Sequence, residues 1–304
     1  MVTAVIGTVF VDVKGFSQVH YLPTGTNPGK VEITHGGVCR NVCENFGRQG
    51  MKAQFVSMTD NTALGRDVRE RLARLGVDLT HTLYSDDGMG MWMAILDENG
   101  DLVGSISKQP DFKALQDHLS DHVDEVLEGC DNVVLEIDTN DAIAETVLSA
   151  AERLKKPVYV IVANMVVILR HPEYLARVRC YISNEIEFSK LMGEDLTRLM
   201  PGEMLSRLDL AMDRFGMPGL VVTMGERGAV YCDRPTGLRG HCPALPSRMV
   251  DSTGAGDAFF SGTVMAINRG MPLDQAVRVG TRLASATLGS ESSCAETIEG
   301  LFDL

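Results

Sequence analysis

The sequence predicts an α/β fold, a doubly wound and mostly parallel sheet flanked by helices, with a small β-sheet lid beside it. Short β-rich runs alternate with helical patterns through most of the 304 residues, which is typical of helices that cover both faces of a parallel sheet. Four of the β-rich runs are almost continuously apolar, as strands buried on both faces are. Two stretches, 12–33 and 91–107, break the alternation and are rich in turn residues.

Six β-rich runs are expected to form strands of the main sheet. In chain order they are residues 2–12, 53–59, 132–138, 157–164, 179–184 and 219–225. Helical patterns lie between them at residues 38–49, 64–75 and 142–154. Gly50 and Gly76 close the first two helices, at positions where helix ends commonly need a positive φ.

Residues 91–107, MWMAILDENGDLVGSIS, carry the signature of a β-hairpin, with turn residues at 98–101 between two β-prone arms. Segments at about 12–33 and 89–108 are therefore expected to form an inserted lid on a single domain of residues 1–304. The apolar lid residues fit two roles, either covering a ligand or meeting the lid of a second copy in a homodimer. They are Met91, Met93, Ile95, Val103 and Ile106.

Composition excludes several classes of protein. Hydrophobic residues make up 44% of the chain and charged residues 23%, as in an ordinary globular protein. A formal net charge of -13 repels nucleic acids and anionic membrane surfaces, so neither is an expected partner. The N-terminus lacks the basic region of a signal peptide, and the longest apolar run, 158–169, is too short to span a bilayer. A cytoplasmic location is expected.

The seven cysteines include no Cys-x-x-Cys pair, which indicates reduced thiols rather than a disulfide framework. Cys39 and Cys43 share one face of a predicted helix, but no nearby histidine or cysteine completes a zinc site. Both are interpreted as small core residues.

Residues 250–260, VDSTGAGDAFF, lead from a loop into an apolar helical pattern, so Asp257 falls in the first turn of a helix. Free N–H groups and the positive end of the helix dipole make such a turn an anion site, and Gly254, Ala255 and Gly256 have too little side chain to keep a phosphate away. An acid there suits a group that accepts a proton from a hydroxyl attacking the phosphate. Taken alone, an acid that only stabilises its own helix is the more frequent explanation.

A family resemblance changes this balance. Residues 250–262, VDSTGAGDAFFSG, closely resemble the C-terminal signature of the ribokinase-like (PfkB) carbohydrate kinases, and residues 33–50, ITHGGVCRNVCENFGRQG, resemble their N-terminal signature. The similarity covers essentially the whole chain. It implies a ribokinase-like fold and an ATP-dependent enzyme that phosphorylates a primary alcohol.

The resemblance also implies roles for residues around the phosphates. Asp257 matches the catalytic base, and Gly254, Ala255 and Gly256 match the residues whose amides bind the transferring phosphoryl group. Residues 183–188, SNEIEF, resemble the Asn-x-x-Glu element of the family. Asn184 and Glu187 are therefore expected to organise Mg²⁺ and its bound waters.

Two further segments resemble nucleotide-side elements of the family. In TMGERG, residues 223–228, Thr223 and Gly225 are expected to face the ATP phosphates, and Gly228 permits the bend. A glycine-containing hairpin turn explains the same pattern. Asp251 and Thr253 resemble positions that in many relatives help to bind a monovalent cation such as K⁺, with residues 285–290 closing that loop.

The acceptor side matches in the same way. The family uses an acid after the first strand to bind sugar hydroxyls, here Asp12, and a Gly-Gly turn followed by an Asn to hold the acceptor, here Gly36, Gly37 and Asn41. Residues 26–41 are most similar to pseudouridine kinases, which carry the same Asn-Pro-Gly-Lys run and an Arg at the position of Arg40.

The resemblance favours pseudouridine, phosphorylated to its 5′-phosphate, as the acceptor. Residues 107–112 and 160–165 differ from the pseudouridine kinases, so another nucleoside or a free sugar such as ribose remains an alternative.

Other interpretations fit less well. In residues 25–31, GTNPGKV, the glycines are one residue too close for a P-loop, and the first strand lacks the G-x-G-x-x-G of dinucleotide-binding proteins. A catalytically silent nucleoside or sugar sensor is expected to lose the acid or the glycines of the anion site. Asp257, Gly254 and Gly256 are all present.

Overall fold

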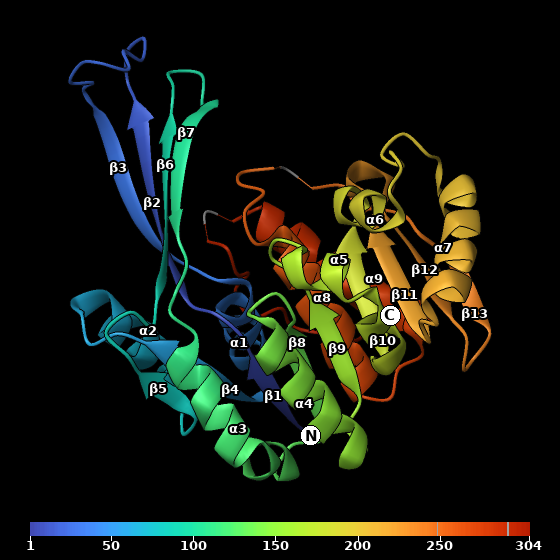
Figure 1. The fold of residues 1–304 in the computed structure, drawn as a ribbon. Coiled ribbons are helices and arrows are strands. Elements are labelled where there is room, and N and C mark those ends of the chain that lie inside the picture. Colours follow the sequence, from blue (N-terminus) through green and yellow to red (C-terminus); the bar gives the residue numbers. More distant parts are fainter. Residues whose placement is uncertain (248, 291) are drawn as a thin grey trace.

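The computed structural model describes residues 1–247, 249–290 and 292–304 and confirms the predicted α/β fold (Figure 1). Within these residues, nine strands form the main sheet in the order β13-β12-β11-β10-β9-β8-β1-β4-β5. Neighbours pair in parallel except at one edge, where β11, β12 and β13 are antiparallel. The strands are β1 (Val2–Ile6), β4 (Lys52–Thr59), β5 (Thr82–Tyr84), β8 (Asn132–Glu136), β9 (Val158–Ile161), β10 (Cys180–Asn184), β11 (Gly219–Thr223), β12 (Ala229–Asp233) and β13 (Leu238–Cys242).

Helices cover both faces of this sheet and create two hydrophobic cores. One face carries α1 (Val38–Arg48), α2 (Ala63–Arg74), α8 (Ala255–Asn268) and α9 (Leu273–Leu288). The other carries α3 (Lys113–Glu128), α4 (Asp141–Arg153), α5 (Val166–Arg170), α6 (Glu185–Met192) and α7 (Pro201–Phe215). Successive residues of β1, Val5 and Ile6, belong to different cores. Burial on both faces explains why these strands are continuously apolar.

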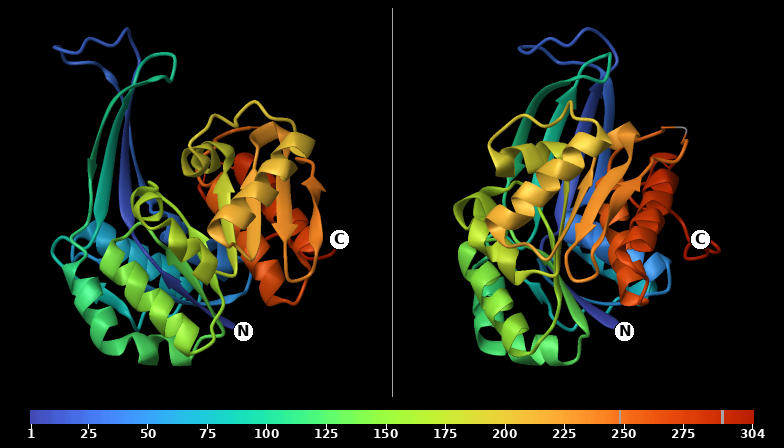
Figure 2. Two further views of the ribbon diagram at one scale, coloured as in Figure 1. Left: turned by 45° about the vertical axis from the view of Figure 1, so that its right-hand side comes forward. Right: turned by 90° about the vertical axis from the view of Figure 1, so that its right-hand side faces the viewer.

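A second, four-stranded sheet projects from the body of the molecule (Figures 1 and 2). We call it the small sheet; its order is β3-β2-β6-β7. Its strands are β2 (Phe10–Ser17), β3 (Gly29–Gly36), β6 (Gly90–Leu96) and β7 (Leu102–Lys108). They lie in the two segments expected to form the lid, and movement of the small sheet over a ligand stays a prediction.

The prediction of one strand over residues 2–12 is wrong. β1 ends at Ile6, and after three residues the chain enters β2 of the small sheet. Gly7 marks the break, since a Cβ atom there would collide with Cys39 and Glu136. The uninterrupted apolar pattern conceals this change of sheet, so Asp12 lies within β2 rather than in a loop after a strand of the main sheet.

Smaller elements follow the predicted rules more closely. Gly50 and Gly76 follow the first two helices with φ of 70° and 76°, as their positions predict. The strand expected at 157–164 stops at Ile161, and the chain continues into α5. Short 3₁₀ turns complete the chain as η1 (Pro172–Arg177) and η2 (Gly225–Arg227).

The cysteines are all free and buried. Among the described residues, no group of three or more His, Cys, Asp or Glu side chains is arranged to hold a metal ion. In the same part of the chain, no helix is both long and apolar enough to cross a membrane.

Candidate active site

The starts of α1 and α8 meet beside the main sheet, and a hydrogen bond joins them. Asn41 Nδ2 donates to Asp257 Oδ2 at 2.6 Å, although the two residues are far apart in the sequence. Ser293 Oγ donates to Asn41 Oδ1 at 3.1 Å. Since the amide oxygen and nitrogen of Asn41 each have a partner, the orientation of the amide is set with its N–H groups toward Asp257. Asp257 lies in the first turn of α8, as predicted.

The surroundings of Asp257 adjust its basicity. Burial raises the pKa of its carboxyl group to about 6, the Asn41 hydrogen bond and the Arg40 charge lower it, and the Asp12 charge raises it. A carboxylate with a pKa of about 6 is mostly ionised at neutral pH and is a stronger base than an ordinary aspartate. Both properties suit a general base.

The first turn of α8 combines a rigid start with an open side. Gly254 precedes the helix with φ of 81°, and a Cβ atom there would collide with the Ser293 carbonyl group. At Gly256, by contrast, a Cβ atom would meet nothing within 4 Å. The amides of Gly254, Ala255 and Gly256 thus start a helix on a fixed backbone, with open space beside Gly256 for an anion.

Gly256→Ala is expected to lower kcat/KM for ATP by up to about 100-fold, since the methyl group would displace a phosphate by about 1 Å. Folding stability should not fall, because the methyl group enters open space. Gly202→Ala is the matched control, since Gly202 is the second residue of α7 and its surroundings are equally open. Steady-state kinetics and thermal unfolding of both variants check this. Unchanged kinetics in Gly256→Ala would place the phosphoryl group elsewhere.

The predicted acceptor residues gather where the small sheet joins α1. A Cβ atom at Gly36 would lie 2.5 Å and 2.6 Å from the two carboxylate oxygens of Asp12. Gly37 has φ of 95°, and a Cβ atom there would lie 2.6 Å from the Thr8 carbonyl oxygen. Burial raises the pKa of Asp12, while Lys14 and Arg40 lower it. Gly36 therefore makes room for the Asp12 carboxylate, and Gly37 lets the backbone turn closely past Thr8 at the start of α1.

Arg40 is held by protein groups on several sides. Its Nε donates to the Gly36 carbonyl oxygen at 3.2 Å, its Nη1 to Glu44 Oε2 at 2.9 Å and its Nη2 to Ser293 Oγ at 3.4 Å. Another Nη2 hydrogen bond goes to the His35 carbonyl oxygen. The side chain is only 2% exposed. Arg40 therefore positions the Gly36 turn and Ser293, and direct contact with the acceptor stays a prediction.

Glu44 anchors this arrangement on α1. Its carboxylate is fully buried and also accepts hydrogen bonds from Arg48 at 3.0 Å and from Arg71 at 2.6 Å and 2.9 Å. Burial alone would raise the pKa of Glu44, but the Arg71 hydrogen bonds and the charges of Arg40, Arg71 and Arg48 lower it to about 2. One carboxylate thus contacts three guanidinium groups, and Arg48 also pairs with Glu296.

Two acids of the site were missed in the sequence analysis. Glu136 ends β8 and accepts hydrogen bonds from the Thr8 amide at 2.8 Å and from the Thr8 hydroxyl. Burial raises its pKa to about 7, and the charges of Asp138 and Asp257 add to this. Asp138 accepts hydrogen bonds from four backbone amides in the segment 163–167. Their position at the carboxyl end of a buried strand beside β1 was the available signal.

Asn184 and Glu187 form the capping box of α6. Asn184 Oδ1 accepts hydrogen bonds from the Ile186 and Glu187 amides at 2.9 Å, and Glu187 Oε2 accepts from the Asn184 amide at 2.9 Å. Burial raises the pKa of Glu187 to about 7, the Asn184 amide lowers it, and the charges of Asp257 and Asp138 raise it. Asn184 Oδ1 and Glu187 Oε2 are used by the helix cap, and Glu187 Oε1 takes part in none of these hydrogen bonds. Carboxylate oxygens suit Mg²⁺ and its bound waters. The two residues therefore fit an ion held through its bound waters rather than one ligated by a cluster of side chains.

The predicted nucleotide turn is also a hairpin turn, as the alternative interpretation expects. It joins the antiparallel strands β11 and β12, and Thr223 pairs with Ala229. Gly225 has φ of 56° and open surroundings, whereas a Cβ atom at Gly228, with φ of 83°, would collide with the backbone of β13. Gly228 thus permits the bend, and Gly225 leaves open space beside the turn.

A cavity of about 520 Å³ lies between the segment before α8 and α9. Its size is within the range of small-ligand sites. Its apolar lining comes from Leu245, Pro246, Val250, Ala286 and Ile298. Ser285 and Gly289 of the segment 285–290, which was expected to close the cation loop, line the cavity as well. Residues 285–288 form the last turn of α9 rather than a loop. Arg282 and Ser247 complete the lining, so the cavity has an apolar wall and a positively charged side chain, a combination that suits the base and phosphates of a nucleotide.

Asp251 and Thr253 lie just before α8. Asp251 Oδ1 accepts a hydrogen bond from the Thr253 amide at 2.9 Å, and Lys14 Nζ donates to Thr253 Oγ1 at 3.3 Å. The ammonium group of Lys14 already supplies positive charge here, so these side chains do not form a site of oxygen atoms alone. Dependence on K⁺ stays a prediction.

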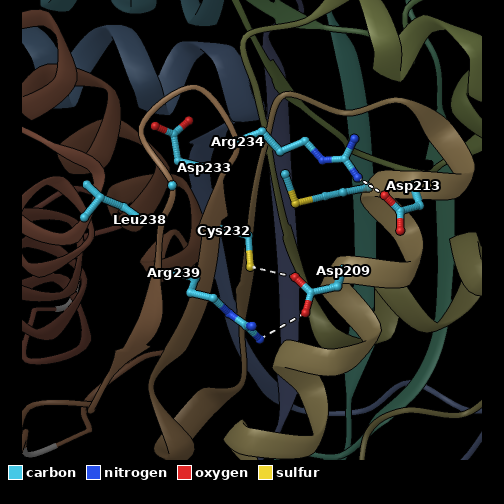
Figure 3. A pocket seen from close by; sticks show the side chains of 9 residues that line it. Asp209, Asp213, Cys232, Asp233, Arg234, Leu238 and Arg239 are labelled. Atoms are coloured by element: carbon cyan, nitrogen blue, oxygen red, sulfur yellow. Dashed lines mark hydrogen bonds and ion pairs between the residues drawn. The ribbon is translucent and has the colours of Figure 1, made fainter.

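A second pocket, of about 280 Å³, lies between α7 and the antiparallel strands (Figure 3). Arg239 and Asp209 form an ion pair at 3.0 Å in its wall. Asp233 in this pocket pairs with Gly219 at the start of β11, whereas Thr223 ends that strand. The pocket therefore lies at the amino end of β11, whereas the candidate active site lies at its carboxyl end.

The fold and the site together define a class, the phosphotransferases that use an alcohol group as acceptor. The chain belongs to the pfkB family of carbohydrate kinases, whose family model matches residues 3–299.

Known relatives act on nucleosides or sugars. The chain is 33% identical to the guanosine-inosine kinase of Exiguobacterium acetylicum over 288 residues. This alignment covers 94% of each chain. It is 25% identical to the pseudouridine kinase of Escherichia coli (strain K12), covering 94% of this chain and 90% of that one. Arabidopsis thaliana ribokinase complexed with ribose and ATP has a TM-score of 0.86 at 21% identity, covering 100% and 98%. The protein is a nucleoside or sugar kinase of this family.

Proposed function

We propose that the protein transfers the γ-phosphoryl group of ATP to the primary 5′ hydroxyl of a ribonucleoside. The observation that carries this proposal is the Asp257 carboxylate in the first turn of α8, held at 2.6 Å by Asn41. This position puts a candidate general base, Asp257, directly beside the backbone amides proposed to bind the phosphoryl group. The 33% identity to a guanosine-inosine kinase over nearly the whole chain supports the nucleoside.

Different residues have different roles in the proposed reaction. Asp257 accepts the proton of the attacking hydroxyl, so that the oxygen becomes a stronger nucleophile as it approaches the phosphorus atom. The amides of Gly254, Ala255 and Gly256 stabilise the negative charge that develops on the transferring group. Asp12 and the Gly36–Gly37 turn hold ribosyl hydroxyls. Thr223 and Gly225 lie along the phosphates of ATP.

Glu187 and Asn184 are the residues that would hold Mg²⁺ through its bound waters. When bound, Mg²⁺ neutralises charge on the nucleotide phosphates. The raised pKa of Glu187, caused mainly by burial, is expected to fall when a cation is present.

Guanosine and inosine are the first acceptors to test. Pseudouridine is the second candidate, favoured by the Asn-Pro-Gly-Lys run at residues 27–30 and by Arg40 before Asn41. A screen of ADP release with ATP and Mg²⁺ should include these three nucleosides, uridine, ribose and hexoses. The proposal predicts the largest kcat/KM for a nucleoside. Turnover confined to free sugars would contradict it.

The pH dependence of turnover is expected to report Asp257. Because the base must be ionised, kcat/KM for the acceptor should fall as the pH drops through about 6, the raised pKa of its carboxyl group in the free enzyme, and should level off above this. Asn41→Ala removes a hydrogen bond that lowers this pKa, so its acidic limb should move to higher pH. The ionisation of free ATP is the same in assays of both enzymes. A difference between the two pH profiles therefore reports the ionisation of Asp257. Identical kcat/KM profiles for the wild-type enzyme and Asn41→Ala would argue against the assignment.

We also propose that the small sheet forms a homodimer interface. Val13, Ile33, Met93 and Ile106 lie side by side across its four strands. Ile106 is 72% exposed. Asp12 alternates with Val13 and therefore projects from the opposite face, toward the active site. Of the two roles open for the apolar residues, this arrangement supports contact with a second copy over cover of a ligand.

Light scattering tests the dimer directly. The wild-type protein is expected to be a dimer, and Ile106→Asp a monomer with an unchanged far-UV spectrum. A monomeric wild-type protein would remove the proposal.

A further inference from the structure

We propose that Trp92 stacks against the nucleobase of the acceptor and so makes nucleosides better acceptors than free ribose. The inference rests on the nucleoside acceptor proposed above and adds the residue that recognises its base.

Strand register places Trp92 beside the acceptor residues. Trp92 of β6 is the direct partner of Asp12 in the parallel pair β2–β6, and paired residues project from the same face of a sheet. Lys14, two residues after Asp12 and on the same face, reaches Thr253 just before α8. The face that carries Trp92 is therefore the one directed at the start of α8.

The indole ring stands among polar neighbours. Its partner on the other side is Ser107 of β7, and Asp12 pairs further along with Thr34. Trp92 is partly exposed. In the described part of the chain, it takes no part in the aromatic and cation-π pairs that other rings form. A large ring that is half open beside a binding carboxylate is available to a ligand.

A second aromatic ring extends this surface. Phe10 pairs with Gly90, and a Cβ atom at Gly90 would collide with the Phe10 ring. The ring therefore lies over Gly90, two residues before Trp92 on the same face. Asp12 places its carboxylate over Gly36 instead, on the β3 side. The carboxylate and the two aromatic rings thus occupy neighbouring strips of the small sheet.

The shape of a nucleoside matches the placement of the carboxylate on the β3 side and of the aromatic rings on the β6 side. The 5′ carbon and the base are attached on opposite sides of the ring oxygen of ribose. When the ribose hydroxyls bind Asp12 and the 5′ hydroxyl lies at Asp257, the base extends away from α8 along the small sheet. Stacking on an aromatic ring is available to every base, because each has a π face. It therefore serves a purine or pseudouridine, and it is not available to free ribose.

Trp92 is the only tryptophan of the chain, so its fluorescence reports binding without any assay of turnover. Guanosine, inosine, pseudouridine and ribose would each be titrated into the wild-type protein without ATP. The nucleosides are expected to quench the emission saturably, and ribose is not. Nucleosides that are phosphorylated but leave the emission unchanged would overturn the inference and leave the proposed function intact.

Two variants provide the kinetic test. Trp92→Ala is expected to lower kcat/KM for nucleosides by about tenfold or more and to leave that for ribose unchanged, while Trp92→Phe should retain most of the activity. Equal losses for nucleosides and ribose, with an unchanged melting temperature, would show a structural role and overturn the inference. If the wild-type enzyme phosphorylates ribose and no nucleoside, the proposed acceptor fails first and the inference fails with it.

Discussion

Asp257→Asn is expected to lower kcat by about 10² to 10⁴, the usual effect of removing a general base, with ATP binding largely retained. Asparagine has nearly the same shape and can still accept the hydrogen bond from Asn41, but it cannot take a proton from the acceptor hydroxyl. Steady-state kinetics with saturating ATP and acceptor measure the loss. Calorimetric titration with ATP shows whether nucleotide binding persists.

Asp274→Asn is the matched control, because Asp274 is an acid in the first turn of α9. If first-turn acids only stabilise their helices, both variants should lose little activity and similar stability. The account predicts a large loss of turnover in Asp257→Asn alone. Near-normal turnover in that variant would contradict the base assignment.

Glu44→Gln is expected to reduce the free energy of unfolding by about 3–5 kcal/mol, the usual cost of removing one partner from a buried ion pair. The change keeps the size of the side chain but leaves the buried Arg40 without its balancing charge. Turnover should also fall, because Arg40 positions Ser293 and the Gly36 turn. Urea denaturation followed by circular dichroism measures the loss of stability.

Asp124→Ala serves as the comparison, because Asp124 forms an exposed ion pair with Arg153 and such pairs contribute about 1 kcal/mol or less.

The pH dependence of the stability difference between the wild-type protein and Glu44→Gln gives a second check. The pKa of Glu44 is about 2 in the folded state, below its ordinary 4.5, so its stabilisation is complete above about 4.5 and disappears as the pH falls toward 2. The wild-type protein should therefore lose its extra stability over Glu44→Gln as the pH falls through this range. An unchanged difference in the free energy of unfolding would contradict an ionised Glu44.

The parts of the candidate site that can be predicted from the sequence are those formed by residues close together in the chain. Gly254 to Asp257 are contiguous, so the helix start and the acid in its first turn can be predicted together. The Asn184 to Glu187 motif is equally compact and forms one cap. Continuous apolar runs separated by helical patterns predicted the main sheet for a similar reason, because each strand and helix carries its own local pattern.

The rest of the site depends on contacts between distant segments. Ser293 orients Asn41, and Lys14 reaches Thr253, each across more than 200 residues, and neither has a local pattern that marks it. Glu136 looked like part of an apolar strand, and its importance follows from the position of β8 beside β1. The strand error at Gly7 has the same origin, since the chain changes sheets without a change in hydrophobicity.

The central claim is that the start of α8 binds the transferring phosphoryl group while Asp257 activates the acceptor hydroxyl. The most direct measurement is a crystal structure of the wild-type enzyme with a non-hydrolysable ATP analogue, Mg²⁺ and guanosine or inosine. The account predicts that Asp257 lies within hydrogen-bonding distance of the 5′ hydroxyl and that the amides of residues 254–256 face the γ-phosphate. A carboxylate turned to solvent, with both ligands bound elsewhere, would contradict the account.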